Sequence, residues 1–144
     1  MTQESQERSK IPPLLVAALI CDAAVEEPHS KKKSLIGIFQ QIFVSTFPTV
    51  REATLYFKIA DAFGYYDIEL KFVNADTNSV LTRGTGSMVV DDRLESPDFL
   101  IPLSRLPIKQ PGRYELQIWA NKMFIGQAFI DAMELPTTPN VVED

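Results

Sequence analysis

The segment YYDIELKFV, residues 65–73, places the strongest limit on how this chain can fold. Its apolar and charged residues alternate, so an extended backbone would have one apolar face and one charged face. The apolar members are Tyr66, Ile68, Leu70 and Phe72, and the charged members between them are Asp67, Glu69 and Lys71. A helix would scatter these apolar residues around its circumference, because its period is about 3.6 residues. The segment therefore predicts a β-strand with one face against a core.

Other short runs indicate that the whole protein is built from strands. The segment TLYFKIA, residues 54–60, alternates in the same way, and NADTNS, residues 74–79, supplies a turn. The length of 144 residues is that of one domain. We predict a single antiparallel β-sandwich of about seven to eight strands, immunoglobulin-like or a related Greek key, over residues 11–134. Residues 1–10 and 135–144 are expected to be flexible tails.

The segment LLVAALICDAAVEE, residues 14–27, allows two interpretations. Two prolines before it and many alanines within it fit a helix, whereas a strand buried on both faces also gives a continuous apolar run. The surrounding strands favour the β interpretation, with residues 34–47 as the partner. Further on, Gly84 and Gly86 predict a bulge or bend, and Pro102 and Pro107 predict an edge strand or an irregular extended segment.

The charge balance argues against a nucleic-acid surface. The formal net charge is −5, and the basic cluster Lys31–Lys33 is expected in a solvated turn. The apolar run at residues 11–20 is too short for a membrane-spanning helix, which needs about 20 residues. Cys21 is the single cysteine, so no internal disulfide can form and a cytoplasmic location is expected. We expect no nucleic-acid partner and no membrane partner.

The residue types give little support for catalysis. Cys21 lies in an apolar run and His29 in a turn, about 25 Å away if a strand of roughly 3.3 Å per residue separates them, which is too far for a nucleophile and its base. One cysteine and one histidine cannot supply a structural zinc site. A loop of acidic residues is either solvated or able to hold a cation through oxygen ligands. Its members are Asp91, Asp92, Glu95 and Asp98. We expect no enzyme and no cofactor.

The segment GRYELQIWANKMFIGQAFID, residues 112–131, predicts a terminal hairpin. Asn121–Lys122 fits a two-residue turn, because asparagine accepts the positive φ that such a turn requires. This turn pairs Trp119 with Phe124 and Ile118 with Ile125. Residues that oppose each other across two strands share one face of the sheet, so the turn also predicts which residues face outward.

One face of this hairpin is predicted to belong to the core and the other to be half polar and half apolar. The expected core residues are Tyr114, Leu116, Ile118, Ile125 and Phe129. The candidate partner-binding residues on the other face are Trp119, Phe124, Ala128 and Ile130. These aromatics are either a cross-strand pair worth about 0.5–1.5 kcal/mol, partly covered by a tail, or a docking patch for a second chain.

Two stretches resemble a known family. ICDAAVEEPHSKKKSLIGIFQQIFVSTFP, residues 20–48, resembles the opening of an uncharacterised bacterial domain family, with Cys-Asp, a short turn, Leu-Ile-Gly-Ile-Phe and a closing Phe-Pro. PGRYELQIWANKMFIGQAFID, residues 111–131, resembles the closing hairpin of that family, a pattern that many β-sandwich domains share. The resemblance covers most of residues 11–134. It implies a compact β-sandwich without an assigned activity, and it carries over no functional residues.

These observations favour a binding protein over an enzyme. The first hypothesis is a non-catalytic protein-interaction or oligomerisation module, which docks a protein partner or a second copy through the face of Trp119 and Phe124. The alternative is a β-sandwich that binds a small ligand or a carbohydrate in a concave site with an exposed aromatic residue, for which Tyr65 and Tyr56 are candidates.

Overall fold

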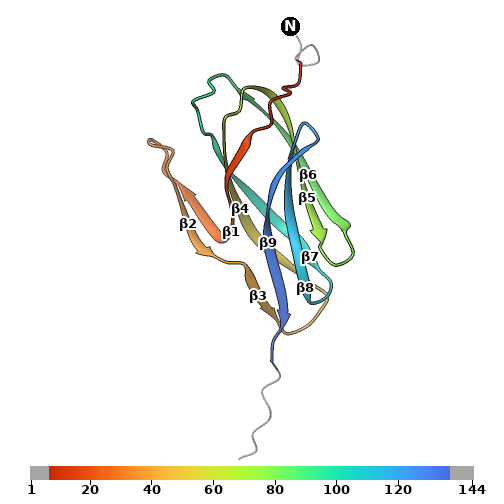
Figure 1. Cartoon of the computed structure of the whole chain (residues 1–144). Coiled ribbons are helices and arrows are strands. Elements are labelled where there is room, and N and C mark those ends of the chain that lie inside the picture. The colour runs from red at the N-terminus through yellow and green to blue at the C-terminus, as the bar shows by residue number, and fades with distance from the viewer. Residues whose placement is uncertain (1–6, 137–144) are drawn as a thin grey trace, which may run out of the picture.

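The computed structural model describes residues 7–136, and its regular structure is entirely β (Figure 1). Nine strands follow one another: β1 (Leu14–Glu26), β2 (Lys33–Ile38), β3 (Gln41–Val44), β4 (Thr49–Ala60), β5 (Gly64–Asn74), β6 (Ser79–Val90), β7 (Asp98–Ile108), β8 (Gly112–Ala120) and β9 (Met123–Glu134). Within this range no helix is present that could cross a membrane. The first segment is a strand, as predicted, and its helical alternative is excluded.

Two sheets pack face to face and form the predicted β-sandwich. One sheet has the strand order β2-β1-β4-β7 and the other has the order β3-β9-β8-β5-β6. Neighbouring strands are antiparallel except β3 and β9, which are parallel. There are more strands than the predicted number of about seven to eight, because residues 34–47 form parts of two short strands in different sheets.

The strand order is that of an immunoglobulin-like domain. When β1, β4 and β7 are equated with strands A, B and E, the strands β9-β8-β5-β6 take the order G-F-C-C′. Tyr114 near the start of β8 donates its hydroxyl proton to the carbonyl of Gln110 at 2.7 Å and accepts from the Gln110 N–H at 3.2 Å. This contact is the tyrosine corner found at the same place in immunoglobulin-like sandwiches.

The core lies between the inward faces of the two sheets. Phe72 of β5 stacks on Tyr114 of β8 with ring centroids 5.4 Å apart, and Phe57 of β4 stacks on Phe99 of β7 at 4.9 Å. Complete burial of an aromatic or large aliphatic side chain stabilises the fold by roughly 1.5–3 kcal/mol. The predicted inward residues of YYDIELKFV all pack into this core, so the alternation in that segment identified the buried face correctly.

β1 changes its partner along its length. Its first part pairs with β4 as far as Cys21, and from Cys21 onward it pairs with β2. The end of β1 and β2 therefore form a hairpin, which stands apart from the sandwich at the left of Figure 1. In its turn, the Glu27 carboxylate accepts hydrogen bonds from the N–H groups of His29 and Ser30, which explains the tight reversal of the chain.

The expectation that all three lysines lie in a solvated turn is wrong for Lys33. Lys31 and Lys32 are exposed, but Lys33 begins β2 and its side chain is 9% exposed. Its ammonium lies 2.6 Å from Asp98 and 3.3 Å from Glu26. The hydrogen bond to Asp98 raises the pKa of Lys33. Lys33 therefore attaches the hairpin to β7, on the far side of its own sheet.

Hydrogen bonds to the sandwich continue beyond residues 11 and 134. The N–H of Ser9 donates to the carbonyl of Tyr65, and the N–H of Leu135 donates to the carbonyl of Val44, both at 2.9 Å. Both donors belong to segments that the sequence predicts as flexible tails. The rest of the predicted tails lies largely outside the described residues, at residues 1–6 and 137–144.

The tyrosine corner gives a test of the fold. The substitution Tyr114→Phe should lower the free energy of unfolding by about 1 kcal/mol, because the hydrogen bond from the Tyr114 hydroxyl to the Gln110 carbonyl is lost. Urea denaturation followed by tryptophan fluorescence measures the change. An unfolding midpoint equal to that of the unmodified protein would show that this contact does not stabilise the start of β8.

Candidate functional site

The predicted turn of the terminal hairpin is confirmed. Asn121 and Lys122 have φ angles of 48° and 65°, and Trp119 pairs with Phe124, as a two-residue primed turn requires. The side-chain amide of Asn121 donates to the carbonyl of Tyr65 at 3.0 Å. The turn is therefore fixed to β5 as well as to its own two strands.

The predicted register beyond this pair is wrong. Ile118 pairs with Gly126 and not with Ile125, because β9 contains a bulge at this point. A shift of one residue turns every later side chain of the strand to the opposite face. Ala128 and Ile130 therefore face the core, with exposed fractions of 7% and 0%. Neither of these two candidate partner-binding residues is accessible to a partner.

The outward face of the hairpin is largely covered by side chains of the same chain. Trp119 and Phe124 meet edge to face with ring centroids 5.3 Å apart, and the ammonium of Lys71 lies 4.2 Å from the centroid of the Trp119 ring. Phe129, expected in the core, lies here with the guanidinium of Arg113 4.5 Å from its ring centroid. Phe124 is 48% exposed and remains the accessible part of the predicted docking patch.

β6 is the longest edge strand in the part of the chain that the structure describes. The edge strands β2 and β3 have 6 and 4 residues, and β7 contains Pro102 and Pro107, as predicted for an edge. β6 has 12 residues and no proline. The bulge predicted at Gly84 and Gly86 is absent, because Thr82–Val90 pairs with β5 in regular register. The outer N–H and C=O groups of β6 can therefore pair with another strand.

Gly84 and Gly86 leave a gap in the wall of the sandwich. They oppose Leu70 and Ile68, whose side chains point inward, yet no atom lies within 4 Å of the position that a Cβ would take at either glycine. A hollow of about 170 Å³ opens there between the two sheets. Its apolar walls are formed by Phe57, Ile68, Leu70, Met88, Phe99 and Ile101. An apolar side chain that enters beside β6 would contact residues of the core.

A second hollow of about 280 Å³ continues this groove toward the start of β6. It shares Leu70, Gly84 and Ile101 with the first hollow and adds Thr82 and Arg105 to the walls. Arg105 has no ion-pair partner among residues 7–136. No acidic side chain of the described chain lines either hollow, although the protein carries a net charge of −5. The groove is thus apolar with a cationic end.

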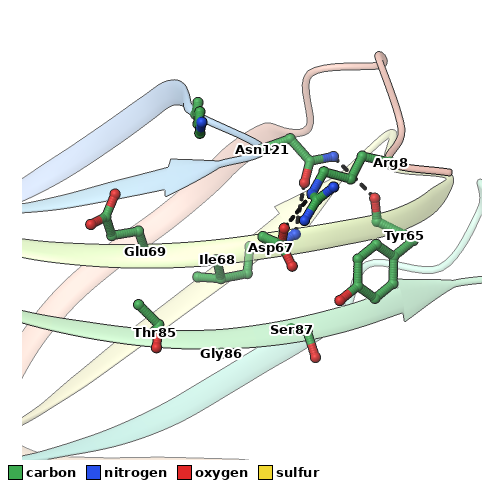
Figure 2. A pocket seen from close by; sticks show the side chains of 10 residues that line it. Arg8, Tyr65, Asp67, Ile68, Glu69, Thr85, Gly86, Ser87 and Asn121 are labelled. Carbon is green, nitrogen blue, oxygen red and sulfur yellow. Dashed lines mark hydrogen bonds and ion pairs between the residues drawn. The ribbon is translucent and has the colours of Figure 1, made fainter. Parts of the chain in front are cut away.

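The outward side of β5 and β6 carries a polar cleft of about 780 Å³ (Figure 2). Asp67 accepts a hydrogen bond from Arg8, which lowers the pKa of the Asp67 carboxyl. Farther along this face, Arg83 pairs with Glu69 at 3.2 Å. The segment Thr85–Ser87 borders both this cleft and the apolar hollow. A strand added at β6 would therefore present successive side chains to a polar and an apolar surface in alternation.

The structure places the residues considered for chemistry in different surroundings. Cys21 is buried, and this burial raises the pKa of its thiol, while His29 lies in the exposed turn after β1. Asp98 of the acidic loop is bonded to Lys33 and accepts a hydrogen bond from the Tyr56 hydroxyl at 2.9 Å. Between residues 7 and 136 no three potential metal ligands of the types His, Cys, Asp and Glu are grouped together.

Together these features define an immunoglobulin-like β-sandwich with one open edge above an apolar groove. The chain belongs to DUF6941, a family of unknown function, whose model matches residues 16–131. The match includes β6, β7 and the groove between them. The expected membership in an uncharacterised family is thereby confirmed. The curated proteins compared with the chain include no match.

The open space at the two glycines gives a prediction about stability. Gly84→Ala and Gly86→Ala should each raise the free energy of unfolding by about 0.5–1 kcal/mol, because glycine within a strand loses more backbone entropy than alanine. Gly126→Ala is the matched control: φ is 154° there, and a Cβ would lie 2.3 Å from a methyl carbon of Leu15, so stability should fall. Thermal unfolding measures all three, and destabilisation at both β6 glycines would contradict the open groove.

Proposed function

We propose that the protein is a non-catalytic protein-interaction module that takes up an extended segment of another protein at β6. The observation that carries this proposal is that the long free edge of β6 borders an apolar groove reaching the core. Strand addition at a sheet edge gives affinity through main-chain hydrogen bonds and specificity through pockets for alternate side chains. β6 would supply the main-chain hydrogen bonds, and the hollow at Gly84 and Gly86 would supply the pocket for side chains.

Two further observations support β6 over the face that the sequence suggested. The ring of Trp119 is already covered by Lys71, so a partner would have to displace that contact. The groove beside β6 is instead bordered by Ile68, Met88 and Ile101, which are only half-buried. Covering apolar surface favours association, and within the described residues the groove offers such surface next to unpaired backbone.

The lone buried thiol of Cys21 agrees with a reducing compartment, and within this proposal the protein acts in the cytoplasm. A bacterial source is likewise part of the proposal, since it follows from the resemblance of the opening hairpin alone.

The docking site can be tested with a displayed library of random peptides selected on the full-length protein. Selected peptides should protect the backbone amides of β6 from hydrogen–deuterium exchange, because they hydrogen-bond to its free edge. Gly86→Lys should abolish binding, since it places a charge in the apolar hollow. Thr77→Lys is the matched control, because it adds the same charge in the exposed turn before β6, away from both hollows, and it should retain binding.

Three results would contradict the proposal. In the first, the selected peptides protect the amides of the hairpin at Trp119 and Phe124 from exchange. Their binding is abolished by Trp119→Ala combined with Phe124→Ala and is unaffected by Gly86→Lys. That result would return the docking surface to the face suggested by the sequence. The second is equal binding to the Gly86→Lys and Thr77→Lys variants. The third is a selection that enriches no peptide.

The polar cleft of Figure 2 supports a second candidate function, the binding of a sugar or similar polar ligand. The supporting observation is that Tyr65 lies at this cleft beside Asp67, Glu69 and Asn121, whereas Tyr56 is engaged with Asp98. A panel of mono- and oligosaccharides should then raise the melting temperature of the protein, and Tyr65→Ala should remove the increase. No change in melting temperature with any sugar would reject this function.

A further inference from the structure

We propose that the segment taken up at β6 runs antiparallel to it and carries two apolar residues at alternate positions, followed two positions later by aspartate or glutamate. This inference rests on the proposed function and names the chemistry of the partner. It combines three observations: the spacing of the two glycines, the apolar walls of the first hollow, and the unpaired arginine at the second.

The spacing of the glycines sets the apolar positions. Side chains on one face of a strand recur every second residue, about 7 Å apart, and Gly84 and Gly86 have this spacing on the face toward the core. A strand paired with β6 would therefore direct two alternate side chains over the two glycines. The apolar lining of the hollow beneath them favours aliphatic side chains at both positions.

The charge in the groove sets the third position. A segment antiparallel to β6 passes Gly86 first, Gly84 second and Thr82 third, and Thr82 lines the same hollow as Arg105. A carboxylate that reaches this hollow would meet the guanidinium of Arg105, for which the described chain supplies no partner. We choose the antiparallel direction because antiparallel pairs are slightly more stable per residue than parallel ones.

A second copy of β6 does not fit this description. Its own sequence, SVLTRGTGSMVV, contains no acidic residue that could meet Arg105. Its side chains toward the core include the two glycines, so pairing of two β6 strands at their centres would leave the hollow unfilled. The groove is therefore better suited to a different segment.

Binding of one designed peptide tests the inference. The probe is a blocked nine-residue peptide with leucine at its third and fifth positions, glutamate at its seventh and threonine elsewhere, titrated into the full-length protein by calorimetry. A peptide with lysine in place of glutamate should bind about fivefold more weakly, as for one partly exposed ion pair. Moving the second leucine to the fourth position should also weaken binding, because the two leucines then lie on opposite faces.

Charge reversal in the protein separates recognition from a general electrostatic effect. Arg105→Glu should reverse the preference, so that the lysine peptide binds more tightly than the glutamate peptide. Arg93→Glu is the matched control, since it makes the same charge change in the exposed loop after β6 and should leave the preference intact. Circular dichroism of both variants establishes that they are folded.

The outcomes separate this inference from the proposed function. Suppose that the glutamate and lysine peptides bind equally well and that Gly86→Lys abolishes the binding of each. This result would overturn the preference for an acidic residue and would leave docking at β6 in place. If no designed peptide and no selected peptide binds, both this inference and the proposed function are overturned. If the protein sediments as a dimer and the Gly86→Lys variant sediments as a monomer, the groove is occupied by a second copy of the chain. That result would also overturn the inference.

Discussion

An open β-sandwich leaves the outer hydrogen-bonding groups of four edge strands without partners in their own sheets, and the structure meets this constraint differently at each edge. β2 and β3 are short. β7 carries two prolines and has a register irregularity against β4, where Ser104 and Arg105 together stand opposite one residue. β6 alone among these strands is long and free of proline, and it pairs with β5 in regular register from Thr82 to Val90. The proposals above follow from that difference, because an edge that is not blocked can accept another strand.

The two glycines of β6 extend the same reasoning to the core. Their lack of side chains leaves the apolar hollow open at the side of the sandwich, where side chains on β6 would otherwise close it. Larger residues would fit at both positions and would favour the extended backbone. The two glycines are therefore expected to lower the stability of β6 modestly, and β6 is also the least protected edge strand. A binding groove would explain both the glycines and the open edge.

Much of the fold could be predicted from the sequence, because it depends on local patterns. Alternation identified β5 with its inward face, Pro102 and Pro107 indicated an edge strand, and Asn121 indicated the turn before β9. The β interpretation of the first segment came from its context alone, since a continuous apolar run does not distinguish a helix from a buried strand.

The errors concern pairing between strands, which a single segment does not encode. The bulge that turns Ala128 and Ile130 inward depends on how β9 fits β8 and on the close approach of Leu15 to Gly126. Gly126 was the available signal, because glycine within a strand often marks such an irregularity. The same rule failed at Gly84 and Gly86, where the glycines lie in a regular strand and leave space. The edge and groove were missed because strand order cannot be read from alternation.

The unequal protection of the four edges also limits what the protein can build. A sheet that grows by edge pairing needs two open edges on each unit, one to join the sheet and one to receive the next unit. Here the far edge of the same sheet is β3, with 4 residues. If partners dock at β6 as proposed, a unit of this kind would offer one site for strand addition. Such docking would terminate a sheet and give a complex of fixed stoichiometry, and it would not propagate a fibre.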